Sequence, residues 1–61
     1  MCESNAFLKK AGREELLLKD VGRVTFPGDG EVRLENIFGE EKTLKARLTE
    51  INFVDHKLIF E

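Results

Sequence analysis

The stretch that decides the fold of this chain is Arg23-Val24-Thr25-Phe26-Pro27-Gly28-Asp29-Gly30-Glu31-Val32-Arg33-Leu34-Glu35. Apolar and polar residues alternate on both sides of its centre, so each flank can present one apolar face to a core. At the centre, Pro27 fixes the backbone as the chain leaves the first flank, and Gly28 and Gly30 accept the positive φ of a tight reversal. The stretch therefore predicts a β-hairpin.

Short segments of strand-like composition continue on both sides of this hairpin. The expected strands span residues 6–9, 15–19, 23–26, 31–38, 42–46, 47–54 and 58–60. Turn signals separate them at residues 11–12, 21–22, 27–30, 39 and 55–57. Short strands at regular turn spacing are typical of a small sandwich or barrel. We therefore predict that residues 1–61 form one all-β domain, a small antiparallel β-barrel-like domain of about six or seven short strands.

Two apolar triplets interrupt the alternation, at residues 16–18 and 58–60. Three consecutive apolar residues in a strand send side chains to both faces, and so small a chain rarely covers both faces from within. A partner surface is the expected cover, and a two-fold axis is the commonest way for a patch to cover itself, so we predict a homodimer. The alternative for the first triplet is a helical turn over residues 14–20, which contain good helix formers.

The charge balance limits the partners. Ten basic and twelve acidic residues give a formal net charge of −2, and the two signs alternate along the chain. This pattern does not form the polybasic surface that attracts nucleic acid or anionic lipid. No apolar run approaches the roughly 20 residues that span a bilayer, and the first residues lack a signal-peptide core. We expect a cytoplasmic protein with neither a membrane nor a nucleic-acid partner.

Catalytic motifs are missing from the sequence, so we predict that the chain is not an enzyme. It has one His and one Cys near opposite ends and none of the HExxH, CxxC, P-loop or GxSxG patterns. His56 lies in a predicted turn, where histidine is usually solvated. A metal-ligand role would require it to fold back near Cys2, which the sequence alone does not establish. The acidic pairs at 14–15 and 40–41 occupy adjacent strand positions that point to opposite faces, so neither forms a catalytic dyad.

An RNA-binding β-barrel is the alternative function. Small barrels bind single strands with aromatic side chains set among basic residues, and this chain has five phenylalanines: Phe7, Phe26, Phe38, Phe53 and Phe60. They occupy apolar positions of an acidic chain that lacks Tyr and Trp, which favours core packing.

The single cysteine, Cys2, directly follows Met1. A lone thiol closes no internal disulfide, and a chain terminus lies at the surface unless it is tied down. Once deprotonated, the thiol offers a soft sulfur donor beside a backbone nitrogen, which suits borderline or soft divalent metals. Removal of Met1 would add the free amine as a donor, whereas retention would leave the Cys2 amide. A free thiol without a role is the competing interpretation.

Three stretches resemble the CooT family of small nickel-binding proteins: Met-Cys-Glu-Ser-Asn-Ala-Phe-Leu at 1–8, Val-Arg-Leu-Glu-Asn-Ile-Phe-Gly-Glu at 32–40 and Ile-Asn-Phe-Val-Asp-His-Lys-Leu-Ile at 51–59. The resemblance extends over essentially the whole chain. It implies a homodimer of small β domains and an accessory, metallochaperone-like role in delivering nickel to carbon monoxide dehydrogenase or its maturation factors. The cysteine at position two that binds Ni(II) in the family maps onto Cys2.

From this resemblance we expect one Ni(II) per dimer, bound by both Cys2 thiolates and neighbouring backbone nitrogens. A roughly planar set of such donors suits Ni(II) and Cu(II), whereas Zn(II) prefers a tetrahedron. Selectivity between nickel and copper, and the identity of the client enzyme, stay open at this point.

Overall fold

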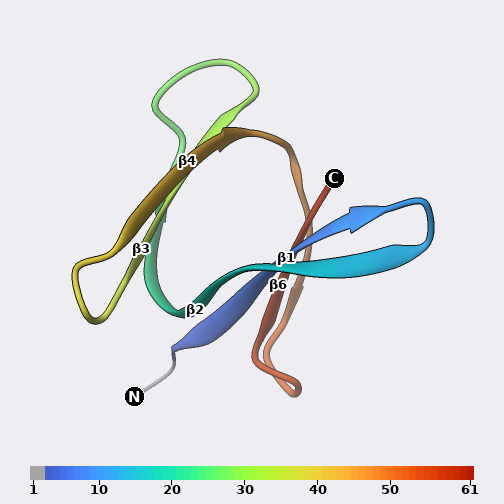
Figure 1. Cartoon of the computed structure of the whole chain (residues 1–61), viewed down its shortest axis with the longest axis horizontal. Helices are drawn as coiled ribbons and strands as arrows, with labels where there is room; N and C mark the ends of the chain where they lie inside the picture. The colour runs from blue at the N-terminus through green and yellow to red at the C-terminus, as the bar shows by residue number, and fades with distance from the viewer. Residues whose placement is uncertain (1–2) are drawn as a thin grey trace.

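Six strands form one mixed β-sheet in the computed structural model, which describes residues 3–61 (Figure 1). The strands are β1 Ser4–Lys10, β2 Arg13–Thr25, β3 Glu31–Asn36, β4 Glu41–Lys45, β5 Leu48–Asn52 and β6 Lys57–Phe60. Their order in the sheet is β4-β3-β2-β1-β6-β5. The all-β prediction is confirmed, and the alternative of a helical turn over residues 14–20 is wrong because these residues belong to β2. Within residues 3–61, no helix has the length and apolar character needed to cross a bilayer.

Strand β2 is longer than the sequence predicted. Its 13 residues replace two expected strands and the turn between them at residues 21–22. The pairing register shifts on both sides of Val21, against β1 and against β3, and Asp20 has a φ of 56°. Such bulges bend a strand without reversing it. The bend lets β2 pair first with β1 and then with β3.

One strand pair is parallel. β1 runs alongside β6 from Asn5 opposite Lys57 to Leu8 opposite Phe60, whereas the other four pairs are antiparallel. The sequence predicted antiparallel pairing throughout. The difference arises because β6 returns to the sheet next to a strand that is distant in sequence, a placement that local turn signals do not encode.

The sheet curls but does not close, so the barrel-like description holds only loosely. The two edge strands, β4 and β5, are consecutive in sequence and are joined by Ala46 and Arg47. The Ala46 N–H donates to the Gly30 carbonyl at 2.9 Å, and Arg47 and Glu61 exchange two backbone hydrogen bonds of 2.8 Å. This connection crosses the open side of the curled sheet that Figure 1 shows.

The core lies on the concave face of the sheet. Its buried cluster consists of Ala6, Val21, Val32, Leu34 and Phe60. Val32 and Leu34 are therefore placed as the alternation predicted. Among the phenylalanines, however, the core-packing prediction is wrong for Phe26, Phe38 and Phe53, which are 59%, 72% and 79% exposed. These three side chains follow the ends of strands, where no neighbouring strand covers them.

The two apolar triplets do not behave alike. Leu17 and Leu18 pack against the core, whereas Leu16 is half exposed. Ile59 and Phe60 are buried within the chain, so the expectation that a partner must cover residues 58–60 is wrong. Phe60 belongs to the core cluster, and Ile59, at the adjacent strand position, is covered by the chain itself.

Candidate functional site

Cys2, the predicted metal ligand, lies outside the described residues. The site can therefore be built only from its described neighbours, beginning with the first strand. β1 starts at Ser4, which is paired with Val21 at the bend of β2.

Asn5, near the start of β1, forms hydrogen bonds with two segments that are distant in the sequence. The Asn5 N–H donates to the His56 carbonyl at 2.9 Å. The Asn5 side-chain oxygen accepts a hydrogen bond of 3.1 Å from the Asp20 N–H. The first residues of β1 are thus held between the bend of β2 and the turn that joins β5 to β6.

The single histidine is brought to the same end of the molecule. Its carbonyl bonds to Asn5, its backbone has a φ of 54°, and the residue is exposed. The sequence left open whether His56 folds back toward the N-terminal segment. The fold places the His56 main chain beside the start of β1.

Metal donors do not gather elsewhere in the described chain. Among residues 3–61, no three or more His, Cys, Asp or Glu side chains form a group that could hold an ion. The acidic pairs have separate contacts instead, because Glu14 Oε1 lies 2.8 Å from Lys57 Nζ and Glu40 Oε1 lies 2.6 Å from Asn36 Nδ2.

A mostly apolar groove of about 220 Å³ opens beside the start of β1. Its lining residues are Ser4, Val21, Gly22, Arg23, Val24, Ile51, Phe53 and Leu58. We call it the N-terminal groove, because Ser4 contributes to its wall.

A braced turn carries the most exposed apolar side chains to the rim of this groove. The Asn52 side-chain oxygen accepts hydrogen bonds from the N–H groups of Val54 at 3.0 Å and Asp55 at 2.9 Å. This Asx-type bracing holds the turn between β5 and β6, and it leaves Phe53 79% and Val54 87% exposed.

The turn between β3 and β4 is built in the same way. The side-chain oxygen of Asn36 accepts hydrogen bonds from the Phe38 N–H at 3.0 Å and the Glu40 N–H at 2.8 Å, and Asn36 is only 9% exposed. Ile37 leans on the bend of β2, since a Cβ added at Gly22 would lie 3.4 Å from its side chain. Both braced turns therefore flank the bend that lines the N-terminal groove.

We call the N-terminal groove, with the exposed side chains of Ile51, Phe53 and Val54, the N-terminal apolar surface. Sequence reasoning missed Asn36 and Asn52. The available signal was an asparagine at a strand end followed by two apolar residues, which is a turn pattern with outward-facing apolar groups.

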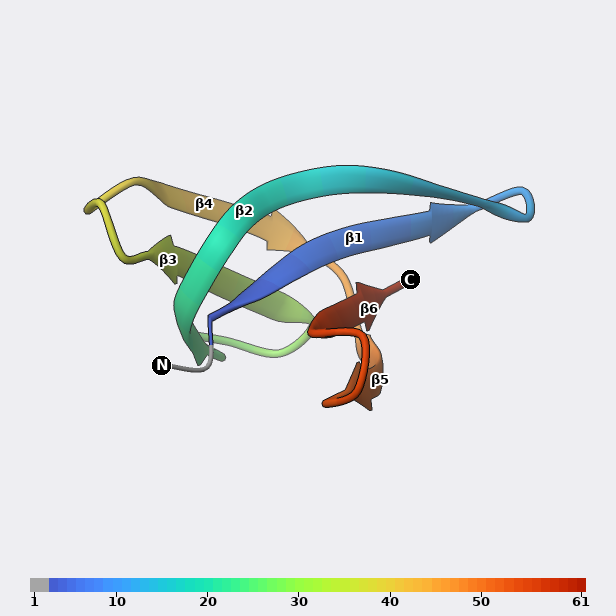
Figure 2. The ribbon, with the colours of Figure 1, turned by 90° about the horizontal axis from the view of Figure 1, so that it is seen from below.

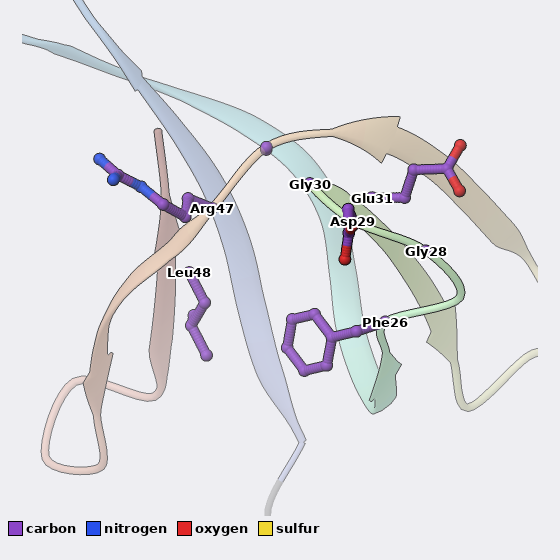
Figure 3. Close-up of a pocket in the computed structure, with 8 residues that line it drawn as sticks. Phe26, Gly28, Asp29, Gly30, Glu31, Arg47 and Leu48 are labelled. Atoms are coloured by element: carbon purple, nitrogen blue, oxygen red, sulfur yellow. The ribbon is translucent and has the colours of Figure 1, made fainter.

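A second pocket, of about 490 Å³, lies beside the loop between β2 and β3 (Figure 3). Phe26 and Leu48 lie on opposite sides of its opening, whereas Arg47 and Glu31 point away from it. The loop that carries Phe26 is on the side of the sheet opposite the N-terminus in Figure 1. The two pockets share no lining residue, although Val24 of the N-terminal groove and Phe26 of this pocket are only two positions apart in the chain.

Comparison with known proteins finds a family and similar solved structures. The family model described as CO dehydrogenase accessory protein CooT matches residues 1–61. A crystal structure of a protein provisionally assigned as CooT, from Carboxydothermus hydrogenoformans, shares 38% sequence identity with a TM-score of 0.88. The match covers 98% of this chain and 95% of that chain. A comparison with curated proteins gave no match.

Proposed function

Because the chain belongs to the CooT family of CO dehydrogenase accessory proteins, we propose that it binds Ni(II) and supports the maturation of a nickel-dependent carbon monoxide dehydrogenase. The observation that carries the proposal is the family match over residues 1–61, which includes Cys2. In this proposal the protein is a non-catalytic, metallochaperone-like factor in the cytoplasm, and nickel is its cargo.

The proposed nickel site is shared by two copies of the chain. Each Cys2 would supply one thiolate and a neighbouring backbone nitrogen, which gives a four-donor set that suits Ni(II) in a square plane. Covalent geometry keeps the Cα of Cys2 within about 8 Å of the Cα of Ser4. Ser4 lines the N-terminal groove, so two copies that meet at this groove would bring both thiols within reach of one ion.

The N-terminal apolar surface supports a homodimer at this end. Phe53 and Val54 are 79% and 87% exposed beside the groove, and exposed apolar patches of this kind are typical of protein–protein interfaces. A two-fold axis would let each copy cover the other's patch. The same axis would complete the metal site, because one thiolate and one nitrogen fill only half of a planar set.

A nickel titration of the wild type, Cys2→Ala and His56→Ala followed by ultraviolet-visible spectroscopy tests the site. The wild type should develop sulfur-to-nickel charge-transfer bands that saturate at half an equivalent of nickel per chain. These bands should vanish in Cys2→Ala, because the chain has no other thiol. His56→Ala is the matched control, since its main chain lies beside Asn5, and it should keep the bands.

Three outcomes would contradict this site. Undiminished nickel binding by Cys2→Ala would remove the proposed ligand, and loss of binding in His56→Ala would turn attention to the imidazole. Saturation at one equivalent per chain would exclude thiolates shared between two copies.

RNA binding remains the second candidate, because Phe26, Phe38 and Phe53 are exposed and aromatic faces can stack on bases. An RNA-binding protein would show an affinity that falls steeply with salt as counterions are released. Titration of a single-stranded RNA at two salt concentrations separates the two functions. Tight, salt-sensitive binding would favour the RNA candidate.

A further inference from the structure

The hairpin formed by β1 and β2 extends beyond the rest of the sheet. β1 pairs with β6 only as far as Leu8, and β3 pairs with β2 only from Val21 onward. The last residues of β1 and the first of β2 therefore pair only with each other. Figures 1 and 2 show this hairpin projecting past the other strands.

The tip of this arm is cationic. Residues 9–13 contain three of the ten basic residues, Lys9, Lys10 and Arg13, and none of the twelve acidic ones, which leaves seven basic against twelve acidic residues elsewhere. All three cations are exposed. In the part of the chain that the structure describes, ion pairs join Arg23 to Glu35 and Lys57 to Glu14, and neither involves the tip.

The tip also contains two unfavourable local features. Lys10 and Arg13 are directly opposite each other in the antiparallel register, where like charges repel. Between them, Ala11 and Gly12 have φ values of 52° and 78°, as a type I′ turn requires, although alanine adopts this region at a cost. Local strain that a chain retains is most often found at functional sites.

We propose that this cationic tip docks on an acidic surface of the client protein. The client follows from the proposed function and is carbon monoxide dehydrogenase. A protein surface fits better than a nucleic acid, because the remaining chain is acidic and would repel a polyanion that extends past the tip. The tip is six residues along β1 from Ser4, about 20 Å at strand spacing, so dimerisation at the N-terminal apolar surface leaves it free.

Binding of the purified enzyme at low and high ionic strength tests the proposal. In the test variant Lys9→Gln/Lys10→Gln/Arg13→Gln, affinity at low salt should fall about tenfold and its salt dependence should flatten, because rim charges steer association. Arg33→Gln/Lys45→Gln/Arg47→Gln is the matched control. It removes the same charge from exposed positions away from the arm and should bind within about twofold of the wild type. A variant that keeps the charges, Lys9→Arg/Lys10→Arg/Arg13→Lys, should retain binding.

Nickel titration of the test variant separates this proposal from the proposed function. Unchanged nickel stoichiometry together with weakened enzyme binding supports the docking role. If the test and control variants weaken enzyme binding equally, the effect is due to net charge and the proposal is wrong. The proposal is also wrong if the wild type does not bind the enzyme. Tight binding of polyuridylate that only the test variant loses would assign the tip to nucleic acid instead.

Discussion

Lys57 and Glu14 join the last strand to the base of the projecting arm, although they are 43 positions apart in the sequence. The Lys57 ammonium donates a hydrogen bond of 2.8 Å to Glu14 Oε1 and lies 5.2 Å from the centroid of the Phe7 ring. Phe7 belongs to β1, which lies between the strands of the two charged residues. The pair therefore ties together three strands at the point where the arm leaves the sheet.

The ion pair between Lys57 and Glu14 makes the free energy of unfolding depend on pH in the alkaline range. The hydrogen bond to Glu14 is the main cause that raises the pKa of Lys57 above its ordinary value of 10.5. The negative charges of Glu14, Asp55 and Glu50 act in the same direction, and desolvation opposes them. A raised lysine pKa stabilises the folded state below the unfolded pKa, and this contribution is lost as the pH rises through the folded value.

Glu14→Gln should therefore lower the free energy of unfolding at neutral pH, and the difference from wild type should shrink as the pH rises above 10.5. Denaturant unfolding at a series of pH values measures it. Glu15→Gln is the control, because the hydrogen bond to Lys57 is made by Glu14. A difference between Glu14→Gln and wild type that stays constant through the alkaline range would contradict this linkage.

Asn36 should matter more for stability than Asn52, although both brace turns of the same design. Asn36 is 9% exposed, so Asn36→Ala removes a buried acceptor from the partly buried N–H groups of Phe38 and Glu40 and should cost about 2 kcal/mol. The hydrogen bonds of Asn52 are exposed, and Asn52→Ala should cost about 0.5 to 1 kcal/mol because water replaces the lost acceptor. Equal losses in chemical denaturation would show that burial does not set the difference.

Ala11→Asn should stabilise the protein by about 1 kcal/mol, since asparagine tolerates the left-handed region better than alanine does. The change creates Asn-Gly, the favoured pair for a type I′ turn with the φ values seen at residues 11 and 12. Ala11→Val is the opposite control, and its β-branched side chain should destabilise the turn. Thermal unfolding measures both variants, and a stable Ala11→Val would argue against this turn geometry.

The proposed homodimer predicts different effects for two exposed phenylalanines. Phe53→Glu should weaken dimerisation at least about tenfold, because it places a charge in the proposed apolar interface. Phe26→Glu changes an exposed side chain at the second pocket, which shares no lining residue with the groove, and should leave the dimer intact. Sedimentation over a range of concentrations measures both. Dissociation caused by Phe26→Glu alone would place the interface at the second pocket instead.

Local alternation was sufficient to predict the central hairpin and the all-β class. Val32 and Leu34 are fully buried as expected, because side chains two apart on a strand share a face wherever that strand is placed. The same reasoning failed at residues 21–22. Glycine there permits either a turn or a bulge, and the choice depends on the pairing of β2 with both β1 and β3.

The candidate site also contains one part that the sequence predicted and one part that depends on tertiary contacts. Cys2 was singled out from its position and from the family resemblance, and it lies outside the described residues. The approach of His56 to Asn5, and of Ile37 to the bend of β2, depends on contacts between segments far apart in the chain.

Strand and turn preferences could be predicted from the sequence, because they are set by backbone geometry and by neighbours a few positions away. Only the tertiary structure decided that β6 runs parallel to β1, that Phe60 is buried while Phe53 is exposed, and that the cationic tip projects. The physical reason is that burial depends on which strands pair. Strand pairing is a competition among long-range contacts that no short stretch of sequence contains.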